Sequence, residues 1–323
     1  MKLYIQAVVM EAEGMRDKMN QPHIVVIGSL NMDIVVQMDR FPVHGETLTG
    51  REAHFVPGGK GANQAVAAAR LGARTTMAGA VGGDAFGKEL LESLHNSGVD
   101  HSQVRQLEGE STGIASIMVS PDDNMIVIVP GANAQCLPEH AAALEPVIAV
   151  ADTVLLQLEI PLETVTAAAV LAKKHGKRVI LNPAPAQKLP QELLDCVDVI
   201  TPNRSELELL TGLSASEGEL ELAMDAMLAM GPDTVVTTLG GDGAVFKQRG
   251  GELHSQSAYT VPVVDTTGAG DAYNAGLAYA LSIGEDIQAA AALASKVSAL
   301  AVTKFGAQDG MPLMADVQAF EGR

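Results

Sequence analysis

Short apolar runs alternate with Ala- and Leu-rich stretches along most of the chain. The first clear run is His23–Ile27, which ends at Gly28 and Ser29. Such alternation predicts βα units, in which strands buried on both faces form a mainly parallel sheet. Further central strands are expected at residues 75–80, 153–157, 178–181, 197–200 and 234–238. Helices are expected at residues 62–71, 86–96, 162–175, 218–230 and 269–283.

Two stretches interrupt this rhythm, at residues 34–55 and 112–129. The second contains the apolar runs 113–119 and 125–129, which flank turn-forming residues at 121–124. We therefore predict a small separate sheet, with strands inserted at about residues 34–56 and 112–130. Residues 1–21 are polar and Met-rich, and are predicted to be a poorly ordered extension before an α/β domain of residues 22–320.

The composition narrows the class of protein. The chain has 323 residues, of which 47% are hydrophobic, enough for the core of one large α/β domain. A formal net charge of -18 repels phosphate backbones and anionic lipids, so we expect neither nucleic acid nor membrane partners. Cys136 and Cys196 show no metal or disulfide spacing, which favours a reduced, cytoplasmic protein. An anionic ligand would need local donors such as helix N-termini.

Two glycine-rich segments fail as nucleotide motifs. Residues 82–88 fit the first seven positions of a P-loop, but Glu89 stands where a Ser or Thr should bind Mg²⁺. We predict there a turn capped by Asp84. Residues 28–33 follow the first strand without a G-x-G-x-x-G pattern, which disfavours a nicotinamide oxidoreductase. They do place Asn31 and Asp33 at the carboxyl end of a strand, where α/β sheets bind ligands, although such residues also form turns.

Residues 57–65 place three glycines around Lys60 immediately before an Ala-rich helix. The glycines allow close approach of the backbone, and the helix start leaves amide donors free. A flexible turn with a solvated Lys60 is the alternative. Asn63, in the first turn of the helix, either points at a ligand or satisfies the helix end.

The segment 265–276 carries the strongest chemical signal. A strand-like run, 259–264, leads into Gly268, Ala269 and Gly270, and then into a helix. The amides there can point at one anion and stabilise charge on a transferring phosphoryl group. Asp271 would lie beside that group, positioned to accept a proton from an attacking hydroxyl. The alternative is that Asp271 only interacts favourably with the helix dipole.

Taken together, residues 28–33, 58–63 and 265–271 resemble the two signature regions of the PfkB carbohydrate kinases, and within that family the ribokinases. Residues 157–159, 182–186, 201–206, 238–240 and 301–308 resemble them too, so the similarity runs from about residue 23 to the C-terminus. The resemblance implies a ribokinase-like α/β fold, with a central mostly parallel sheet flanked by helices on both faces. The two interrupting stretches would form a small β-sheet lid, which also pairs two subunits into a homodimer.

The resemblance also implies the site residues. The sugar would be held by Asn31, Asp33, Gly59, Lys60, Asn63, Glu159 and Asp271. ATP would be bound by Asn203, Glu206, Thr238, Leu239, Gly240, Gly241, Asp242, Gly243, Gly270 and Ser295. A monovalent cation, K⁺, would lie beside the anion hole at Asp265, Thr267, Ala301, Lys304, Gly306 and Gly310.

Three of these positions carry particular expectations. Glu206 is expected to act on hydrated Mg²⁺, an ion that keeps several of its waters. Gly310 stands where ribokinases often have a Ser, so one cation ligand is missing. Ser295 stands where the family often has a larger polar group near adenine.

The implied reaction is the ATP-dependent phosphorylation of D-ribose at its 5-hydroxyl, which gives ribose 5-phosphate and ADP. Asp271 would be the general base, and the amides of residues 268–271 would form the anion hole. A kinase for deoxyribose, fructose or an adenosine-like nucleoside would require changes only in the pocket, and stays open. A non-catalytic sugar or nucleotide sensor on the same fold would lack the base or the anion hole, and both are present in the sequence.

Overall fold

A computed structural model describes residues 21–121 and 123–322, so residues 1–20 of the predicted N-terminal extension lie outside the described residues. A nine-stranded sheet has the order β13-β12-β11-β10-β9-β8-β1-β4-β5. From β11 to β5 the neighbouring strands are parallel, whereas β12 and β13 form an antiparallel edge. These strands are β1 His23–Ile27, β4 Arg74–Gly82, β5 Asp100–Leu107, β8 Thr153–Leu156, β9 Arg178–Leu181, β10 Val199–Ile200, β11 Thr234–Thr238, β12 Ala244–Gln248 and β13 Leu253–Gln256.

The central strands are buried on both faces, and β1 shows why. Ile24 and Val26 belong to one apolar cluster, and Val25 and Ile27 belong to another on the opposite face. Successive side chains of a strand point to opposite sides, so a strand between two helical layers must be apolar at every position. The continuous apolar runs in the sequence are therefore the strands, and the predicted mostly parallel sheet is confirmed.

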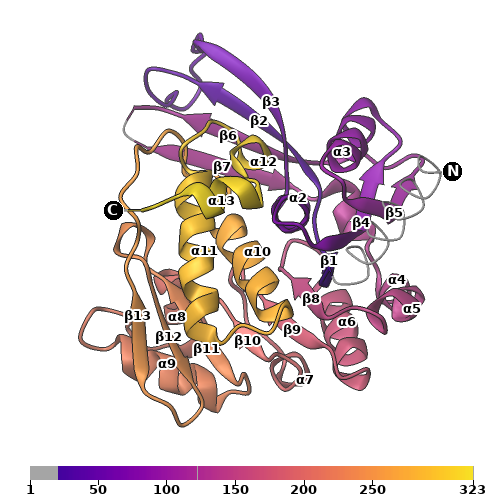
Figure 1. The fold of residues 1–323 in the computed structure, drawn as a ribbon. Helices are drawn as coiled ribbons and strands as arrows, with labels where there is room; N and C mark the ends of the chain where they lie inside the picture. The colour runs from indigo at the N-terminus through magenta and orange to yellow at the C-terminus, as the bar shows by residue number, and fades with distance from the viewer. Residues whose placement is uncertain (1–20, 122, 323) are drawn as a thin grey trace, which may run out of the picture.

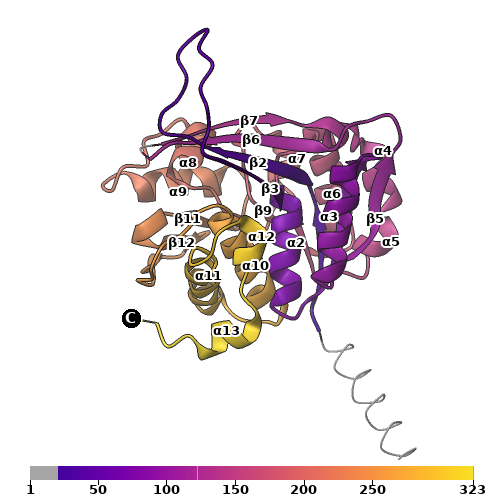
Figure 2. The same cartoon turned by 90° about the horizontal axis from the view of Figure 1, so that it is seen from above.

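Helices cover both faces of this sheet, as predicted (Figure 2). One face carries α2 Lys60–Arg70, α3 Ala85–Asn96, α10 Ala269–Ser282, α11 Ile287–Ala301, α12 Ala307–Gly310 and α13 Met314–Ala319. The other carries α4 Pro138–Ala143, α5 Glu145–Ile148, α6 Leu162–Lys174, α7 Gln191–Leu194, α8 Arg204–Thr211 and α9 Leu220–Ala229. Asp84 caps α3 by accepting a hydrogen bond from the Gly87 amide at 2.8 Å, so the segment that resembled a P-loop is a capped turn, as predicted.

The predicted small separate sheet is present, and it lies across the carboxyl edge of the large one (Figure 1). Its order is β3-β2-β6-β7, with β2 Asn31–Gln37, β3 Glu52–Gly58, β6 Gly113–Val119 and β7 Asn124–Val129. β2 begins at Asn31, earlier than predicted, so Asn31 and Asp33 lie two residues apart on one face of a strand. The start of β2 and the end of β3 therefore both lie at the site described below.

One predicted element is wrong, and others were not predicted. Residues 259–264 form no strand, because no strand of the described chain pairs with them. Among the described residues, their backbone hydrogen bond to another segment runs from the Val264 amide to the Val302 carbonyl, at 2.8 Å. Val263 and Val264 are instead exposed. The elements absent from the sequence prediction include β5, the antiparallel edge strands β12 and β13, and the helices α8 and α11.

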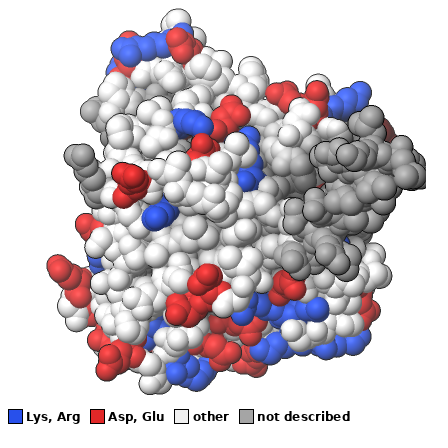
Figure 3. Space-filling view, in the orientation of Figure 1, with Lys and Arg blue, Asp and Glu red and all other residues white. Residues whose placement is uncertain are grey.

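The surface carries both signs of charge. On the face shown in Figure 3, Lys and Arg side chains are interspersed with Asp and Glu. Among the described residues, no helix is long and apolar enough to cross a membrane.

Candidate active site

Polar side chains gather at the carboxyl ends of the parallel strands, below the small sheet. This is the edge at which open α/β sheets bind ligands. Five of the strands contribute polar residues at or just after their carboxyl ends. These are Ser29 and Asn31 after β1, Gln157 and Glu159 after β8, Asn182 after β9, Thr201 and Asn203 after β10, and Thr238 at the end of β11.

Asp271 lies in the first turn of α10, at the centre of this edge. Gly268 caps the helix with φ of 80°, a conformation that favours glycine. Asp271 is 6% exposed, and both of its carboxyl oxygens accept amide hydrogen bonds from α2. Asn63 Nδ2 donates to Oδ2 at 2.9 Å, and Gln64 Nε2 donates to Oδ1 at 2.9 Å. Asn63 therefore points into the site, which was one of its two predicted roles.

The amides predicted to form an anion hole are not equivalent. The Ala269 amide donates to the Thr266 carbonyl at 3.2 Å, so it is already engaged and the expectation for that residue needs correction. The tight turn through Gly268 brings these two groups together. Within the described part of the chain, the amides of Gly270 and Asp271 make no backbone hydrogen bond, as the first turn of a helix allows.

A second group of side chains surrounds Glu159. Its Oε2 accepts hydrogen bonds from Ser29 Oγ at 2.5 Å, the Lys60 amide at 3.3 Å and Asn31 Nδ2 at 3.4 Å. The fully buried Asn133 donates to Asn31 Oδ1 at 2.8 Å, which fixes the orientation of the Asn31 amide. Four segments distant in sequence thus converge on one polar cluster.

The pKa values of Asp33 and Lys60 are both raised in this pocket, which disfavours the charged form of Asp33 and favours the charged form of Lys60. Burial, together with the nearby charges of Glu159 and Asp271, raises the pKa of Asp33 to about 7. Burial lowers the pKa of Lys60, but the attraction of Asp271, Glu159 and other carboxylates outweighs it, so the pKa of Lys60 is raised. The pocket thus holds a lysine cation among carboxylates.

A cavity of about 450 Å³ adjoins Gly270 on the side of α11. Of the residues predicted to bind ATP, those that line it are Thr238, Gly240, Gly241, Gly243, Gly270 and Ser295. Leu239 and Asp242 are not among the lining residues. They close the tight turn after β11 through backbone bonds, with the Leu239 amide donating to the Gly243 carbonyl at 2.8 Å.

Asn203 and Glu206 form a reciprocal cap at the start of α8. The Asn203 side chain accepts from the Glu206 amide at 2.9 Å, and Glu206 Oε2 accepts from the Asn203 amide at 2.8 Å. Asn203 also bridges to Thr238, which places the cap beside the cavity. Burial raises the pKa of Glu206, opposed by the Asn203 amide and the charge of Lys60.

Several of the predicted cation residues contact one another near the start of α10. Asp265 Oδ1 accepts from the Thr267 amide at 2.9 Å, and its Oδ2 accepts from the Gly306 amide at 2.9 Å. Gly310 packs against the Ala301 carbonyl so closely that a Cβ at residue 310 would lie 2.5 Å from that oxygen. Both carboxylate oxygens of Asp265 thus already accept protein donors, Oδ1 also from Thr267 Oγ1 at 2.7 Å.

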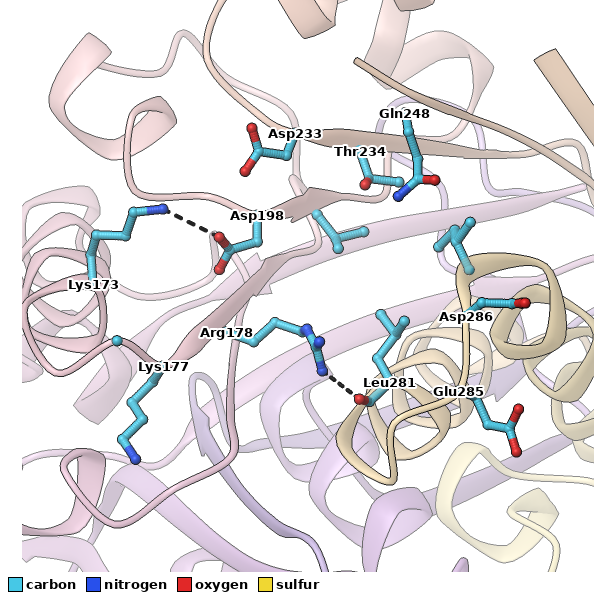
Figure 4. A pocket seen from close by; sticks show the side chains of 13 residues that line it. Lys173, Lys177, Arg178, Asp198, Asp233, Thr234, Gln248, Leu281, Glu285 and Asp286 are labelled. Atoms are coloured by element: carbon cyan, nitrogen blue, oxygen red, sulfur yellow. Dashed lines mark hydrogen bonds and ion pairs between the residues drawn. The ribbon is translucent and has the colours of Figure 1, made fainter. Parts of the chain in front are cut away.

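A cavity of about 580 Å³ lies at the opposite edge of the large sheet, at the amino ends of β9, β10 and β11 (Figure 4). Its charged groups are largely paired within the protein. Lys173 Nζ binds Asp198 at 3.2 Å, and Arg178 donates to the Leu281 carbonyl. We therefore place the candidate site at the carboxyl edge.

The sequence prediction of the site omitted several buried side chains. Among them are Gln64, Asn133, Gln157 and Asn182. Gln157 and Asn182 could have been found as polar residues that follow an apolar strand. Asn133 and Gln64 gave no such signal, because their partners Asn31 and Asp271 lie far away in the sequence.

Comparison with known proteins matches residues 21–314 to the family described as pfkB family carbohydrate kinase. The chain is 43% identical over 297 residues to the ribokinase of Bacillus subtilis (strain 168), which covers 92% of this chain and 98% of that protein. It is 42% identical over 297 residues to the ribokinase of Lactococcus lactis subsp. lactis, with 92% and 96% covered. It is similar to the solved structure of Arabidopsis thaliana ribokinase complexed with ribose and ATP, with a TM-score of 0.88, 36% identity, and 93% of this chain and 98% of that chain covered.

Proposed function

Because the chain belongs to the pfkB family of carbohydrate kinases, we propose that it transfers the γ-phosphoryl group of ATP to the 5-hydroxyl of D-ribose. The observation that carries this proposal is the placement of Asp271. Its carboxylate is buried between the polar side chains around Glu159 and the free amides at the start of α10. A general base beside an anion-binding helix start is the arrangement that phosphoryl transfer to a hydroxyl requires.

The sugar would bind between Asp271 and Glu159. Asn31, Asp33, Lys60, Asn63 and the backbone of Gly59 surround this space, in addition to the two carboxylates. Asn63 Oδ1 is buried and has no hydrogen-bond partner among the described residues, so a sugar hydroxyl can satisfy it. Carboxylates and amides in these positions would reject a sugar that lacks the matching hydroxyl, since their buried groups would then stay unpaired.

The nucleotide would occupy the cavity beside α11, with its phosphates directed toward Gly270. Gly240, Gly241 and Gly243 allow the backbone to approach the nucleoside, and Ser295 offers a hydroxyl within the same cavity. Asn203 lies at the rim of this cavity, next to Thr238. The free amides of Gly270 and Asp271 would receive the transferring phosphoryl group.

The proposed reaction forms no covalent bond between the protein and the substrate. Asp271 accepts the proton of the 5-hydroxyl while the hydroxyl oxygen attacks the γ-phosphorus in line, and the bond from that phosphorus to the β–γ bridging oxygen breaks to release ADP. Asn63 and Gln64 hold the carboxylate in place, and the small sheet covers the sugar from water. Positioning and electrostatic stabilisation then supply most of the rate enhancement.

Two metal ions fit the residues present. Glu206 has a half-buried carboxyl group next to Asn203 and would hold Mg²⁺ through water, a bound ion that neutralises charge on the phosphates. K⁺ would bind at Asp265 and the carbonyls near Thr267, Ala301, Lys304 and Gly306. Gly310 supplies no side-chain oxygen. Its missing Cβ instead leaves room for the Ala301 carbonyl.

The proposed function is tested by measuring ADP release from ATP with a panel of acceptors. We expect kcat/KM for ribose to exceed that for deoxyribose, fructose and adenosine by about tenfold or more, because an unpaired buried group costs about 1–3 kcal/mol. We expect the rate with ribose to fall when K⁺ is replaced by a larger organic cation, and to vanish without Mg²⁺. A higher kcat/KM for deoxyribose or a nucleoside would show that the protein is a kinase for that acceptor and not for ribose. No ADP release with any acceptor would favour the non-catalytic sensor.

We also propose that the small sheet pairs two copies of the chain. β7 is an edge strand whose residues 124–129 are all exposed, including the consecutive apolar side chains of Met125, Ile126, Val127, Ile128 and Val129. An exposed apolar edge strand of this kind favours association with another surface. Symmetric pairing of two such strands would bury both.

Val127→Glu is expected to convert the dimer into a monomer, because a charge would be buried at the centre of the paired surface. Sedimentation velocity at micromolar concentration measures the change. Leu222→Glu on α9 is the matched control, since Leu222 is similarly exposed, at 62% against 57% for Val127, but belongs to a helix outside the small sheet. A monomeric wild-type protein, or equal effects of both substitutions, would contradict the proposal.

A further inference from the structure

Gln64 is a fully buried side chain on α2 that contacts Asp271, and the scheme above gives it no more than a supporting contact. We propose that Gln64 is a positioning residue for the catalytic base, and that Gln157 and Asn182 fix its amide in the required orientation. The proposal rests on the proposed kinase function, since it concerns the group that accepts the proton. It also gives a role to two sequence segments, 157–159 and 182–186, beyond the contact of Glu159 with the sugar.

The orientation of the Gln64 amide follows from its neighbours. An ionised carboxylate can only accept, so the atom that lies 2.9 Å from Asp271 Oδ1 must be Nε2. Its second hydrogen points to Asn182 Oδ1 at 3.2 Å, and Gln64 Oε1 accepts from Gln157 Nε2 at 2.6 Å. A flipped amide would oppose oxygen to oxygen at Asp271 and nitrogen to nitrogen at Gln157. The network therefore allows one orientation.

The network constrains Asp271 at both oxygens. Asn63 and Gln64 are consecutive residues of α2, yet each donates to a different oxygen of the same carboxylate at 2.9 Å. Two donors in this arrangement fix the rotation of the carboxyl plane as well as its position. Because each oxygen keeps a second lone pair, the carboxylate can still accept a proton from the substrate.

Asp271 lies among several other ionisable side chains. The residue is buried, and Asp33 on β2 and Glu159 after β8 place further negative charge in the same pocket. Lys60 on α2 is the neighbouring cation, and Glu206 on α8 also acts on Lys60. Hydrogen bonds from buried amides to a carboxylate are charge-assisted, so Asn63 and Gln64 hold this carboxylate more strongly than neutral hydrogen bonds would.

A purely structural role is the competing explanation. Gln64 joins α2 to α10 and to the loops after β8 and β9, so its removal should lower stability in either case. The two explanations differ in what happens to turnover. Loss of a purely structural residue lowers the melting temperature, whereas loss of a positioning residue also lowers kcat with little change in KM.

Gln64→Met removes the donor and nearly conserves volume. We expect kcat for ribose to fall by about 10- to 100-fold, with KM for ATP and ribose within about threefold of wild type, because a misplaced base slows the chemical step. Gln64→Glu places a second carboxyl group beside Asp271. We expect the kcat of this variant relative to wild type to rise as pH is lowered from about 8 to about 6, since the introduced carboxyl group can donate to Asp271 only when it is protonated.

Thr76→Val is the control, because it removes a buried side-chain hydrogen bond of 3.0 Å to His23 at the opposite edge of the sheet. It should lower the melting temperature and leave kcat unchanged. Gln157→Met provides a second test should Gln64 variants fold poorly, with an expected loss of several-fold in kcat. An active wild type with kcat unchanged in Gln64→Met and Gln157→Met would overturn the proposal. An inactive wild type would instead overturn the kinase function on which it rests.

Discussion

Asp271→Asn is expected to lower kcat for ribose by about 10²- to 10⁴-fold, the range associated with loss of a general base. The KM for ATP should change little, because the cavity proposed to hold the nucleotide lies on the other side of the start of α10. The substitution keeps the size of the side chain and removes only its capacity to accept the proton. Initial rates of ADP release at saturating ribose measure the effect.

The same substitution also disturbs the hydrogen bonds around the base. An Asn side chain has one acceptor oxygen, whereas Asn63 and Gln64 both donate to residue 271. One of these donors would then face an NH₂ group, which costs about 1–3 kcal/mol for an unsatisfied buried group. Removing a negative charge from the neighbourhood of Asp33 and Glu159 offsets part of this cost. We therefore expect a small change in stability and a large change in rate.

Asp286→Asn provides the matched control. Asp286 begins α11, the helix that packs against α10, and its Oδ1 accepts from the Ala289 amide at 2.8 Å. Asn is an equally good residue at such a position, so neither stability nor kcat should change. Turnover of Asp271→Asn within about threefold of wild type would remove Asp271 from the role of base.

The central strands were the most predictable part of the fold. β1, β9 and β11 have the predicted bounds, because a strand covered by helices on both faces must be a continuous apolar run. β5 was missed because it is an edge strand with a mostly polar sequence between Asp100 and Leu107. α11 was missed because its 15 residues are rich in Ala, which gives a weak apolar period. Residues 259–264 were wrongly predicted to be a strand, because an apolar run forms a strand only where another strand lies beside it.

The site was predictable to the extent that its residues follow strands or begin helices. Asn31, Glu159 and Asp271 occupy such places, and the topology of a parallel sheet brings them to one edge. The residues that orient them were not predictable, because orientation depends on contacts across the fold. Asn133 fixes Asn31 across 102 residues, and Gln64 reaches Asp271 across 207. Local sequence carries no information about such pairs.

A substitution at Gly59 is expected to have the second large effect on ribose kinetics. It caps α2 with φ of 88°, and it packs against the start of β2. A Cβ at this residue would lie 2.6 Å from the Asn31 amide nitrogen and 2.9 Å from the Leu30 Cα, and neither backbone group can rotate away. The only relief is to separate β2 from α2, which would move Asn31 away from Lys60 and Asn63.

Gly59→Ala is therefore expected to raise KM for ribose at least about tenfold and to lower kcat by about 100-fold, the cost of misplacing reacting groups by about 1 Å. Gly72→Ala is the matched control, because Gly72 also has a positive φ, of 96°, but nothing lies within 4 Å of its added Cβ. Backbone strain of about 1–3 kcal/mol applies to both variants, so both should melt at lower temperature. Only Gly59→Ala adds a backbone clash within the proposed sugar site. Equal kinetics for the two variants, measured at saturating ATP over a range of ribose concentrations, would show that close packing at Gly59 does not shape that pocket.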